Sequence, residues 1–310
     1  MRTARSILLF LGLSCSLVGG LFGLASCGTA QTPSVTTAPE TGRHALWRVA
    51  AGQTPTELGT AYLLGSIHLG RAEAASLPEV VETAFAEADA VVFELDLDEV
   101  YADPLGILEL AFFQDQRTLQ SELSDKTWAL VLERVNDPSF LLTFAKAKPW
   151  FMALTLSIGE LESDGYSAQA GLDHVLFQRA KETGKERVAL ETAAEQLAFF
   201  DSFTREEQEM FLLQTLQEAG DTTDAADEMV ALWEAGDTEG LEEMFADEEK
   251  RFPVLFDKLL EERNRNWLPR IEELLREHGS LLVVVGAAHL VGDGSLVELL
   301  RQAGYRVGQM

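Results

Sequence analysis

Two histidines in this sequence follow a glycine by three positions, and each comes directly after an apolar run. His68 ends the stretch Tyr-Leu-Leu-Gly-Ser-Ile-His, and His289 ends Val-Val-Val-Gly-Ala-Ala-His. With 24 glycines in 310 residues, chance would place this spacing at about one histidine in thirteen. A third such frame, Gly171-Leu-Asp-His174, begins a predicted helix, and we give His174 no role. A single histidine at a strand end is usually structural, but a matched pair indicates a site.

Two glutamates stand at equivalent places, directly after short β-branched runs. Glu94 follows Ala-Val-Val-Phe, and Glu191 follows Arg-Val-Ala-Leu. Ligands of open α/β sheets bind outside the carboxyl ends of parallel strands. Four strands are therefore expected to bring His68, Glu94, Glu191 and His289 to one edge of a sheet. Alternatively, Glu94 belongs to a solvated run, because three further acidic residues follow it within five positions.

This combination of residues is suited to metal chemistry. Two imidazoles and one carboxylate can hold a catalytic divalent metal and leave a position for water. We expect His68 and His289 to be ligands, with either Glu94 or Glu191 as the third ligand and the other glutamate as a base. Such a set suits Zn, Mn, Co or Fe alike. The sequence contains no H-E-x-x-H, G-x-S-x-G, Walker A or G-x-G-x-x-G motif.

Arg263 is a further candidate with two interpretations. It lies in the charged segment Asp257-Lys-Leu-Leu-Glu-Glu-Arg-Asn264, which Trp267 follows. Charges at this spacing are typical of a solvated helix face. The other interpretation is that Arg263 points into the cleft and binds an anionic group of the substrate.

The elements that must position these residues alternate along the chain. Apolar runs predict strands at 45–50, 60–65, 90–93, 187–190, 281–285 and about 305–308, the first two forming a hairpin. Helical patterns cover 79–88, 104–161 with a break at 148–150, 171–184, 193–276 and 295–303. This order predicts an α/β fold: a central mixed, largely parallel sheet with flanking helices and a large inserted helical block.

The N-terminus predicts export and a lipid anchor. Arg2 and Arg5 precede an apolar run, and the Leu-Ala-Ser-Cys27 that follows resembles the bacterial lipobox. We therefore expect a signal peptide at 1–26, lipidation of Cys27, a flexible tether at 27–42 and one domain at 43–310. Glycine after the cysteine favours the outer membrane of a Gram-negative envelope, facing the periplasm. The alternative is an ordinary signal peptide or an N-terminal membrane helix with an incidental cysteine.

The overall charge excludes one class of function. The chain carries 51 acidic and 24 basic residues, a net charge of −27. No basic stripe is present to bind phosphates, so we expect no nucleic-acid partner. The charge indicates no other partner.

The ordered motifs resemble those of the TraB/GumN family. They are the two Gly-x-x-His frames, Val-Phe-Glu94-Leu-Asp, Leu-Glu191-Thr and Glu-Arg263-Asn264-x-x-Trp, in order from about residue 46 to the C-terminus. The second frame departs slightly from the family pattern, because it reads Gly-Ala-Ala-His where Gly-Ala-Gly-His is commoner in bacterial members. The family is related to the Tiki proteins, membrane-tethered metal-dependent proteases of animals.

The resemblance implies a fold and a site. The fold would be shared with erythromycin-esterase-like and ChaN-like proteins. The site would consist of His68, His289 and the glutamates Glu94 and Glu191, with Arg263 as an addition. We therefore expect a lipid-anchored envelope protein with a metal-dependent, peptidase-like hydrolase site acting on peptides or proteins. The alternatives are a non-catalytic ligand-binding module and a metal-free, esterase-like hydrolase with a histidine base.

Overall fold

The computed structural model describes residues 43–50, 59–71 and 77–310. The predicted signal peptide, Cys27 and the tether at 27–42 lie outside the described residues. Within the described ranges, no helix has both the length and the apolar character that a membrane span needs.

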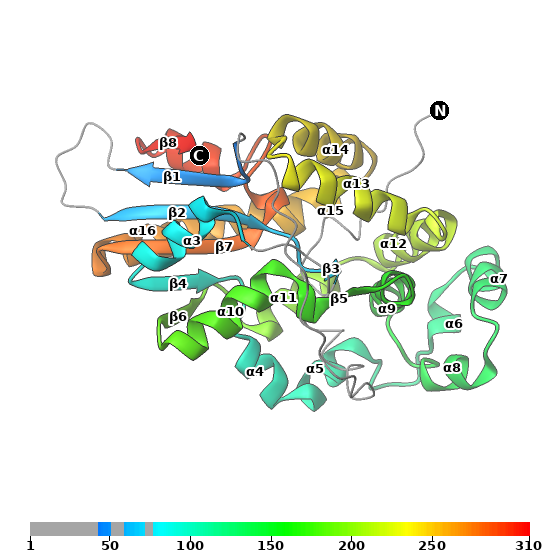
Figure 1. Cartoon of the computed structure of the whole chain (residues 1–310). Coiled ribbons are helices and arrows are strands. Elements are labelled where there is room, and N and C mark those ends of the chain that lie inside the picture. The colour runs from blue at the N-terminus through cyan, green and yellow to red at the C-terminus, as the bar shows by residue number, and fades with distance from the viewer. Residues whose placement is uncertain (1–42, 51–58, 72–76) are drawn as a thin grey trace.

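The domain is organised around a mixed six-stranded sheet in the order β6-β4-β7-β2-β1-β8 (Figure 1). β6, β4, β7 and β2 are mutually parallel, while β1 pairs antiparallel with both β2 and β8. The strands are β1 (Leu46–Ala50), β2 (Thr60–Ser66), β4 (Ala90–Phe93), β6 (Glu186–Ala189), β7 (Ser280–Gly286) and β8 (Arg306–Gln309). The predicted hairpin and the largely parallel sheet are confirmed. An additional two-stranded sheet, β3 (Gly70–Arg71) with β5 (Tyr166–Ser167), was not predicted from the sequence.

Helices cover both faces of this sheet, which is why its central strands are apolar throughout. On one face, α3 (Glu79–Glu87) and α10 (Leu172–Thr183) pack Phe85 and Leu176 against the sheet. On the other face, α16 (Glu262–Glu277) and α17 (Leu296–Gln302) pack Trp267 and Leu296. Parallel strands buried on both faces carry continuous hydrophobic runs rather than alternating ones. The flanking helices predicted at 79–88, 171–184 and 295–303 are therefore confirmed.

The remaining helices form a block beyond the carboxyl ends of the parallel strands (Figure 1). Its core includes Leu69, Leu95 and Ala287, each of which follows a strand end, so the block is packed against the edge where the candidate residues lie. At its centre is α9, whose residues are mostly buried. The elements of the block are α4 (Leu97–Ala102), α5 (Pro104–Ala111), α6 (Leu119–Glu122), α7 (Asp125–Arg134), α8 (Pro138–Thr143), α9 (Pro149–Ser163), η2 (Ala168–Ala170), α11 (Ala193–Asp201), α12 (Arg205–Glu218), α13 (Thr222–Glu234), α14 (Thr238–Arg251), α15 (Pro253–Phe256), the π-helical turn η3 (Asp257–Glu261) and η4 (Ala287–His289).

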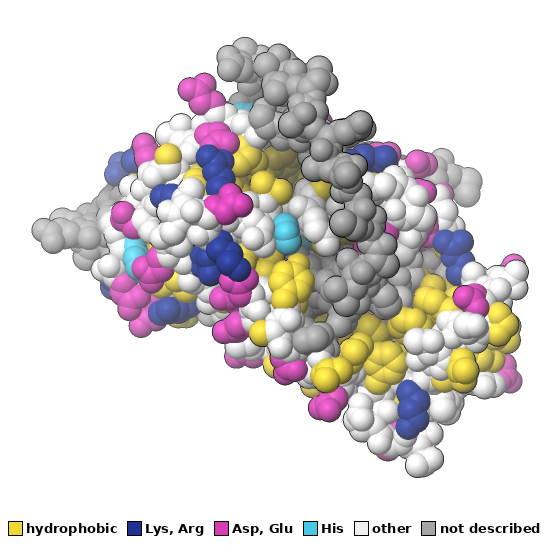
Figure 2. All heavy atoms as spheres, turned by 60° about the horizontal axis from the view of Figure 1, so that its bottom comes forward, with side chains coloured by type: hydrophobic (Ala, Val, Ile, Leu, Met, Phe, Trp, Pro, Cys, Tyr) yellow, Lys and Arg dark blue, Asp and Glu magenta, His cyan; other side chains and the backbone are white. Residues whose placement is uncertain are grey.

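The surface reflects the composition of the chain. On the face shown in Figure 2, acidic side chains are spread among fewer basic ones, as the net charge of −27 requires. Hydrophobic side chains gather at the lower right of this view. Leu105 of α5, Leu132 of α7 and Leu142 of α8 are among the exposed large apolar residues.

Candidate active site

Four predicted side chains converge at the carboxyl ends of the parallel strands. His68, Glu94, Glu191 and His289 follow β2, β4, β6 and β7, and all four are buried. The Oε1 atom of Glu94 lies 3.7 Å from Nε2 of His68 and 3.9 Å from Nε2 of His289. The structure thus brings together the two histidines and Glu94, residues spread over more than two hundred positions of the sequence.

Glu94 is held as a carboxylate at the centre of this cluster. Its Oε1 accepts the backbone N–H of Gly286 at 2.7 Å, and its Oε2 accepts Nη2 of Arg263 at 2.8 Å. Burial acts to raise the pKa of Glu94, but the charges of Arg263 and the two histidines and the Gly286 hydrogen bond outweigh it. The pKa is lowered to about 2, so Glu94 is ionised at neutral pH. The interpretation of Glu94 as part of a solvated run is wrong.

The hydrogen bonds at Nδ1 define the tautomer of both histidines. Nδ1 of His68 lies 2.9 Å from Oδ2 of Asp173, and Nδ1 of His289 lies 2.7 Å from Oδ1 of Asn264. Because both partner oxygens accept, we assign the proton of each ring to Nδ1 and the lone pair to Nε2. The two Nε2 lone pairs therefore belong to the atoms that are nearest Glu94.

The two histidines nevertheless differ electrostatically. Burial lowers the pKa of His289 to about 3, and the positive charges of Arg263 and His68 act in the same direction. Burial also acts to lower the pKa of His68, but the adjacent Asp173 carboxylate outweighs it and the net shift is upward. His289 is thus neutral across the physiological range, whereas His68 is the more basic ring.

Arg263 supplies the fixed positive charge of the site. Its side chain is fully buried, with Nε 3.0 Å from Oε1 and Nη2 2.8 Å from Oε2 of Glu191. Nη1 donates to the carbonyl oxygen of Leu259, in the π-helical turn that precedes α16, at 3.0 Å. The guanidinium also lies 4.4 Å from the ring centroid of Trp267. The prediction of a solvated helix face is wrong for Arg263, because this side of α16 packs against the strand ends.

Glu191 and Glu94 both accept a hydrogen bond from Nη2 of that guanidinium. Burial is the main cause that raises the pKa of Glu191, and the negative charge of Glu94 adds to the effect, while Arg263 opposes it. The capping box of Thr192 and Glu195 begins α11 directly after Glu191 and fixes the chain there. The two glutamates therefore have opposite pKa shifts, which is the arrangement that separates an anionic group from a proton carrier.

Sequence reasoning gave no role to two further residues of the site, Asp173 and Asn264. Asp173 lies inside the third Gly-x-x-His frame, whose spacing draws attention to His174 instead. Asn264 is part of the Glu-Arg-Asn motif, but spacing alone does not show that an amide will meet a histidine. Each orients a histidine that follows a parallel strand.

Two features of the donor set are those of a metal site. Nε2 of His68 is buried and has no hydrogen-bond partner. A Cβ on Gly286 would lie 3.0 Å from that nitrogen and 3.5 Å from Oε1 of Glu94, so the missing side chain leaves a cradle between the donors. Ligand atoms around a tetrahedral metal are about 3.4 Å apart, slightly closer than the donors here.

One contact keeps the donors from forming a closed shell. Nη1 of Arg263 lies 3.0 Å from Nε2 of His289, and that nitrogen accepts the hydrogen bond. Across the described residues, no group of three or more His, Cys, Asp or Glu side chains is arranged so that it could hold a metal ion. The residues fit a metal by chemistry and tautomer, and a bound ion would replace the Arg263 contact at His289.

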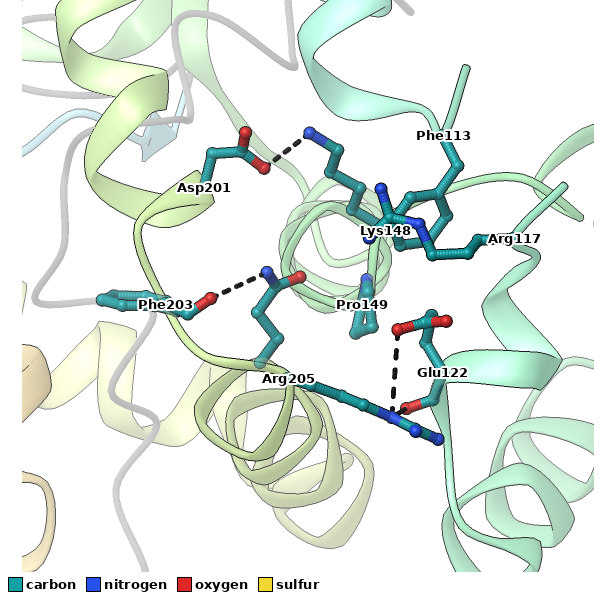
Figure 3. Close-up of a pocket in the computed structure, with 9 residues that line it drawn as sticks. Phe113, Arg117, Glu122, Lys148, Pro149, Asp201, Phe203 and Arg205 are labelled. Atoms are coloured by element: carbon teal, nitrogen blue, oxygen red, sulfur yellow. Dashed lines mark hydrogen bonds and ion pairs between the residues drawn. The ribbon is translucent and has the colours of Figure 1, made fainter. Parts of the chain in front are cut away.

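A cavity of about 230 Å³ lies elsewhere, among α6, α9, α11 and α12 (Figure 3). None of the predicted site residues lines it. Lys148 contacts Asp201 at 2.5 Å, and Arg205 lies 3.8 Å from Glu122. Its residues are Phe113, Arg117, Glu122, Lys148, Pro149, Asp201, Phe203, Arg205 and Gln208. Because acidic residues already pair with its charges, the cavity adds nothing to the candidate site.

Comparison with known proteins identifies similar chains. The model of the TraB/PrgY/gumN family matches residues 45–309. The chain is 26% identical over 245 residues to the uncharacterized protein YbaP of Escherichia coli, covering 77% of this chain and 87% of that protein. It is 24% identical over 320 residues to the metalloprotease TIKI2 of Danio rerio, covering 84% of this chain but only 60% of that protein. No solved structure matches.

Proposed function

The chain belongs to the TraB/PrgY/gumN family, and we propose that its buried His–Glu–Arg cluster is the active site of a metal-dependent hydrolase that cleaves peptide bonds. One observation carries the proposal: Nε2 of His68 and Nε2 of His289 both lie within 4 Å of Oε1 of Glu94, at 3.7 and 3.9 Å. The similarity to an animal metalloprotease supports hydrolysis and the use of a metal.

In this proposal, three atoms hold the metal: Nε2 of His68, Nε2 of His289 and Oε1 of Glu94. When bound, a divalent cation supplies positive charge that polarises a carbonyl and makes a water molecule more acidic. Glu94 suits the role of ligand because its lowered pKa keeps it anionic. The hydrogen bonds that the two imidazoles donate to Asp173 and Asn264 keep both rings in the tautomer that a metal requires.

Glu191 and Arg263 provide the remaining chemistry. Hydrolysis joins the oxygen of water to the carbonyl carbon, breaks the carbon–nitrogen bond and leaves a proton on the released amine. Glu191 is the group to carry that proton, because burial raises the pKa of its carboxyl above the usual value. Arg263 holds the Glu191 carboxylate in place through both of its oxygens and keeps a positive charge in the site.

A second function is favoured by the contact between Arg263 and His289. If Arg263 remains hydrogen-bonded to Nε2 of His289, that nitrogen cannot bind a metal. In this second proposal the site works without a metal, and His68 is the general base. The pair of Asp173 and His68, with Nε2 of His68 free of hydrogen bonds, is suited to removing a proton from water.

Metal content and cleavage together test these proposals. The purified chain is stripped with a chelator, reconstituted with Zn, Mn, Co or Fe, and assayed against a fluorogenic peptide library. We expect cleavage to depend on one of these metals and to be lost in His68→Ala and His289→Ala. His278→Ala is the matched control, because His278 caps α16 away from the site.

The outcomes separate the candidates. Cleavage that survives complete metal removal would overturn the metal-dependent proposal and support His68 as a general base. Stoichiometric metal binding without cleavage of any peptide would instead support a non-catalytic binding module.

We further propose that the chain is lipid-anchored through Cys27 and faces the periplasm of a Gram-negative envelope. The support is in the sequence, where basic residues, an apolar run and Leu-Ala-Ser-Cys27 follow in order. Labelling with a clickable palmitate analogue should mark the wild-type chain and not Cys27→Ser. Equal labelling of the two chains would contradict the anchor.

A further inference from the structure

The first turn of α10 is docked directly against the end of β2. Leu172 donates its backbone N–H to the carbonyl oxygen of Ile67 at 3.0 Å. A Cβ on Gly171 would lie 2.3 Å from the carbonyl oxygen of His68, so only glycine permits this approach. The third Gly-x-x-His frame thus has a structural purpose: its glycine brings the first turn of a helix against the backbone of His68.

This packing of α10 against β2 places the Asp173 side chain next to the His68 ring. Oδ2 of Asp173 lies 2.9 Å from Nδ1 of His68, with the two side chains 13% and 9% exposed. Because an ionised carboxylate only accepts hydrogen bonds, this contact selects the Nδ1–H tautomer.

We infer that Asp173 is a positioning residue, which holds the His68 ring in the orientation and tautomer that present Nε2 to Glu94. The inference rests on the proposed function, because in that function Nε2 of His68 is a ligand of the metal. It adds that the residue of functional importance in the third frame is Asp173 and not His174.

His289 provides an internal comparison. Its Nδ1 is held by the amide oxygen of Asn264 at 2.7 Å, so its partner is neutral where the partner of His68 is charged. A carboxylate partner makes an imidazole a stronger donor to a metal than an amide does. His68 is therefore the stronger ligand of the pair, and its strength depends on Asp173.

The test measures tautomer and metal affinity separately, on the purified full chain. Nitrogen NMR of ring-labelled histidine in the metal-free protein reports the tautomer of His68, assigned with His68→Ala. Calorimetric titration with Co²⁺ reports the affinity. In Asp173→Ala we expect a mixed tautomer and a Co²⁺ affinity weakened by about ten- to hundredfold, the usual loss for such partners. Asp173→Leu keeps nearly the size of the side chain but cannot accept a hydrogen bond, so it carries the same test should Asp173→Ala fail to fold.

Glu82→Gln is the matched control. Glu82 also contacts α10, through an ion pair with Arg179 at 2.5 Å, but it is not a partner of His68. A mere loosening of α10 would affect Co²⁺ binding in Glu82→Gln as well, whereas the positioning role predicts no change there.

The results distinguish this inference from the proposed function. If Asp173→Ala and Asp173→Leu keep the wild-type tautomer and bind Co²⁺ within twofold of wild type, the inference is overturned while the metal site stands. If the wild-type chain binds no Co²⁺ but the tautomer changes in both variants, Asp173 positions His68 and the metal proposal fails.

Discussion

Nη1 of Arg263 lies 3.0 Å from Nε2 of His289, so a permanently charged group rests against a nitrogen proposed to bind a metal. Arginine only donates, and His289 must therefore accept through Nε2. In the structure, the guanidinium supplies the positive charge that balances Glu94 and Glu191. The site thus contains a buried positive charge of its own.

Loss of this guanidinium should destabilise the whole domain. In Arg263→Met, two buried carboxylates lose their cation, and we expect the free energy of unfolding to fall by about 3–5 kcal/mol. Urea unfolding measures the change. Arg265→Met is the control, because Arg265 is half exposed and its ion pairs with Asp257 and Glu261 should contribute less than about 1 kcal/mol. Equal losses in the two variants would contradict the buried pairing.

The two glutamates should separate binding from catalysis. Glu94→Gln removes the proposed carboxylate ligand, so we expect the metal affinity to fall by about tenfold or more. Glu191→Gln removes the proton carrier, so kcat should fall by about 10²- to 10⁴-fold with the metal affinity retained. Calorimetry and peptide cleavage by the reconstituted chain measure the two quantities. The reverse pattern would exchange the assigned roles.

Filling the cradle at Gly286 should block the site without unfolding the domain. The Cβ in Gly286→Ala would approach Nε2 of His68 to 3.0 Å and would stand between the donors. We expect metal affinity and cleavage to drop by about tenfold, with Tm lowered by only a few degrees. Gly159→Ala in α9 is the matched control, since nothing lies within 4 Å of its added Cβ. Unchanged metal affinity in Gly286→Ala would place the metal elsewhere.

A second buried acidic pair, in the helical block, should make stability depend on pH. Burial, aided by the charge of Glu218, raises the pKa of Glu248 to about 7 despite the contact of Arg251 with Glu248 at 2.7 Å. Between pH 4.5 and 7 the folded chain therefore holds this proton more tightly than the unfolded chain, so this contribution to stability is lost as pH rises.

Replacing Glu248 should remove that dependence. We expect Glu248→Gln to be more stable than wild type at pH 8 by about 1–2 kcal/mol, and to gain nothing at pH 4.5. Urea unfolding from pH 4.5 to 8 gives the comparison. The control is Glu249→Gln, because its neighbour Glu249 is exposed and should change little. A difference that does not vary with pH would contradict the raised pKa of Glu248.

Much of the fold could be predicted because the parallel strands carry continuous apolar runs. A glycine or an ionisable residue follows each of these runs and shows where the strand ends. Because the strands are parallel, this is enough to predict that His68, Glu94, Glu191 and His289 lie on one edge of the sheet. The pattern of charges around Arg263 predicted a solvated helix face, but the side chain is buried. The spacing of charges along a helix does not show which of its turns packs against another element. The short strands β3 and β5 are two residues each and have no periodicity to detect.

Asp173 and Asn264 could not be predicted because their roles depend on contacts across the fold. The helix that carries Asp173 reaches His68 through a glycine packed on a carbonyl oxygen, a feature that no local pattern encodes. Asn264 meets His289 only because α16 lies along the end of β7. In both cases the sequence supplied the residue type, and the packing of helices on the sheet supplied its partner.

The order of the strands also determines when this site can exist during biosynthesis. Arg263 and Glu94 are separated by 169 residues, and His68 and Asp173 by 105. The strand that leads to His289 is inserted between β4 and β2 and emerges after the whole helical block. A chain that is only partly synthesised lacks β7 and therefore has no complete cluster. The proposed activity would therefore begin only when β7 takes its place between β4 and β2.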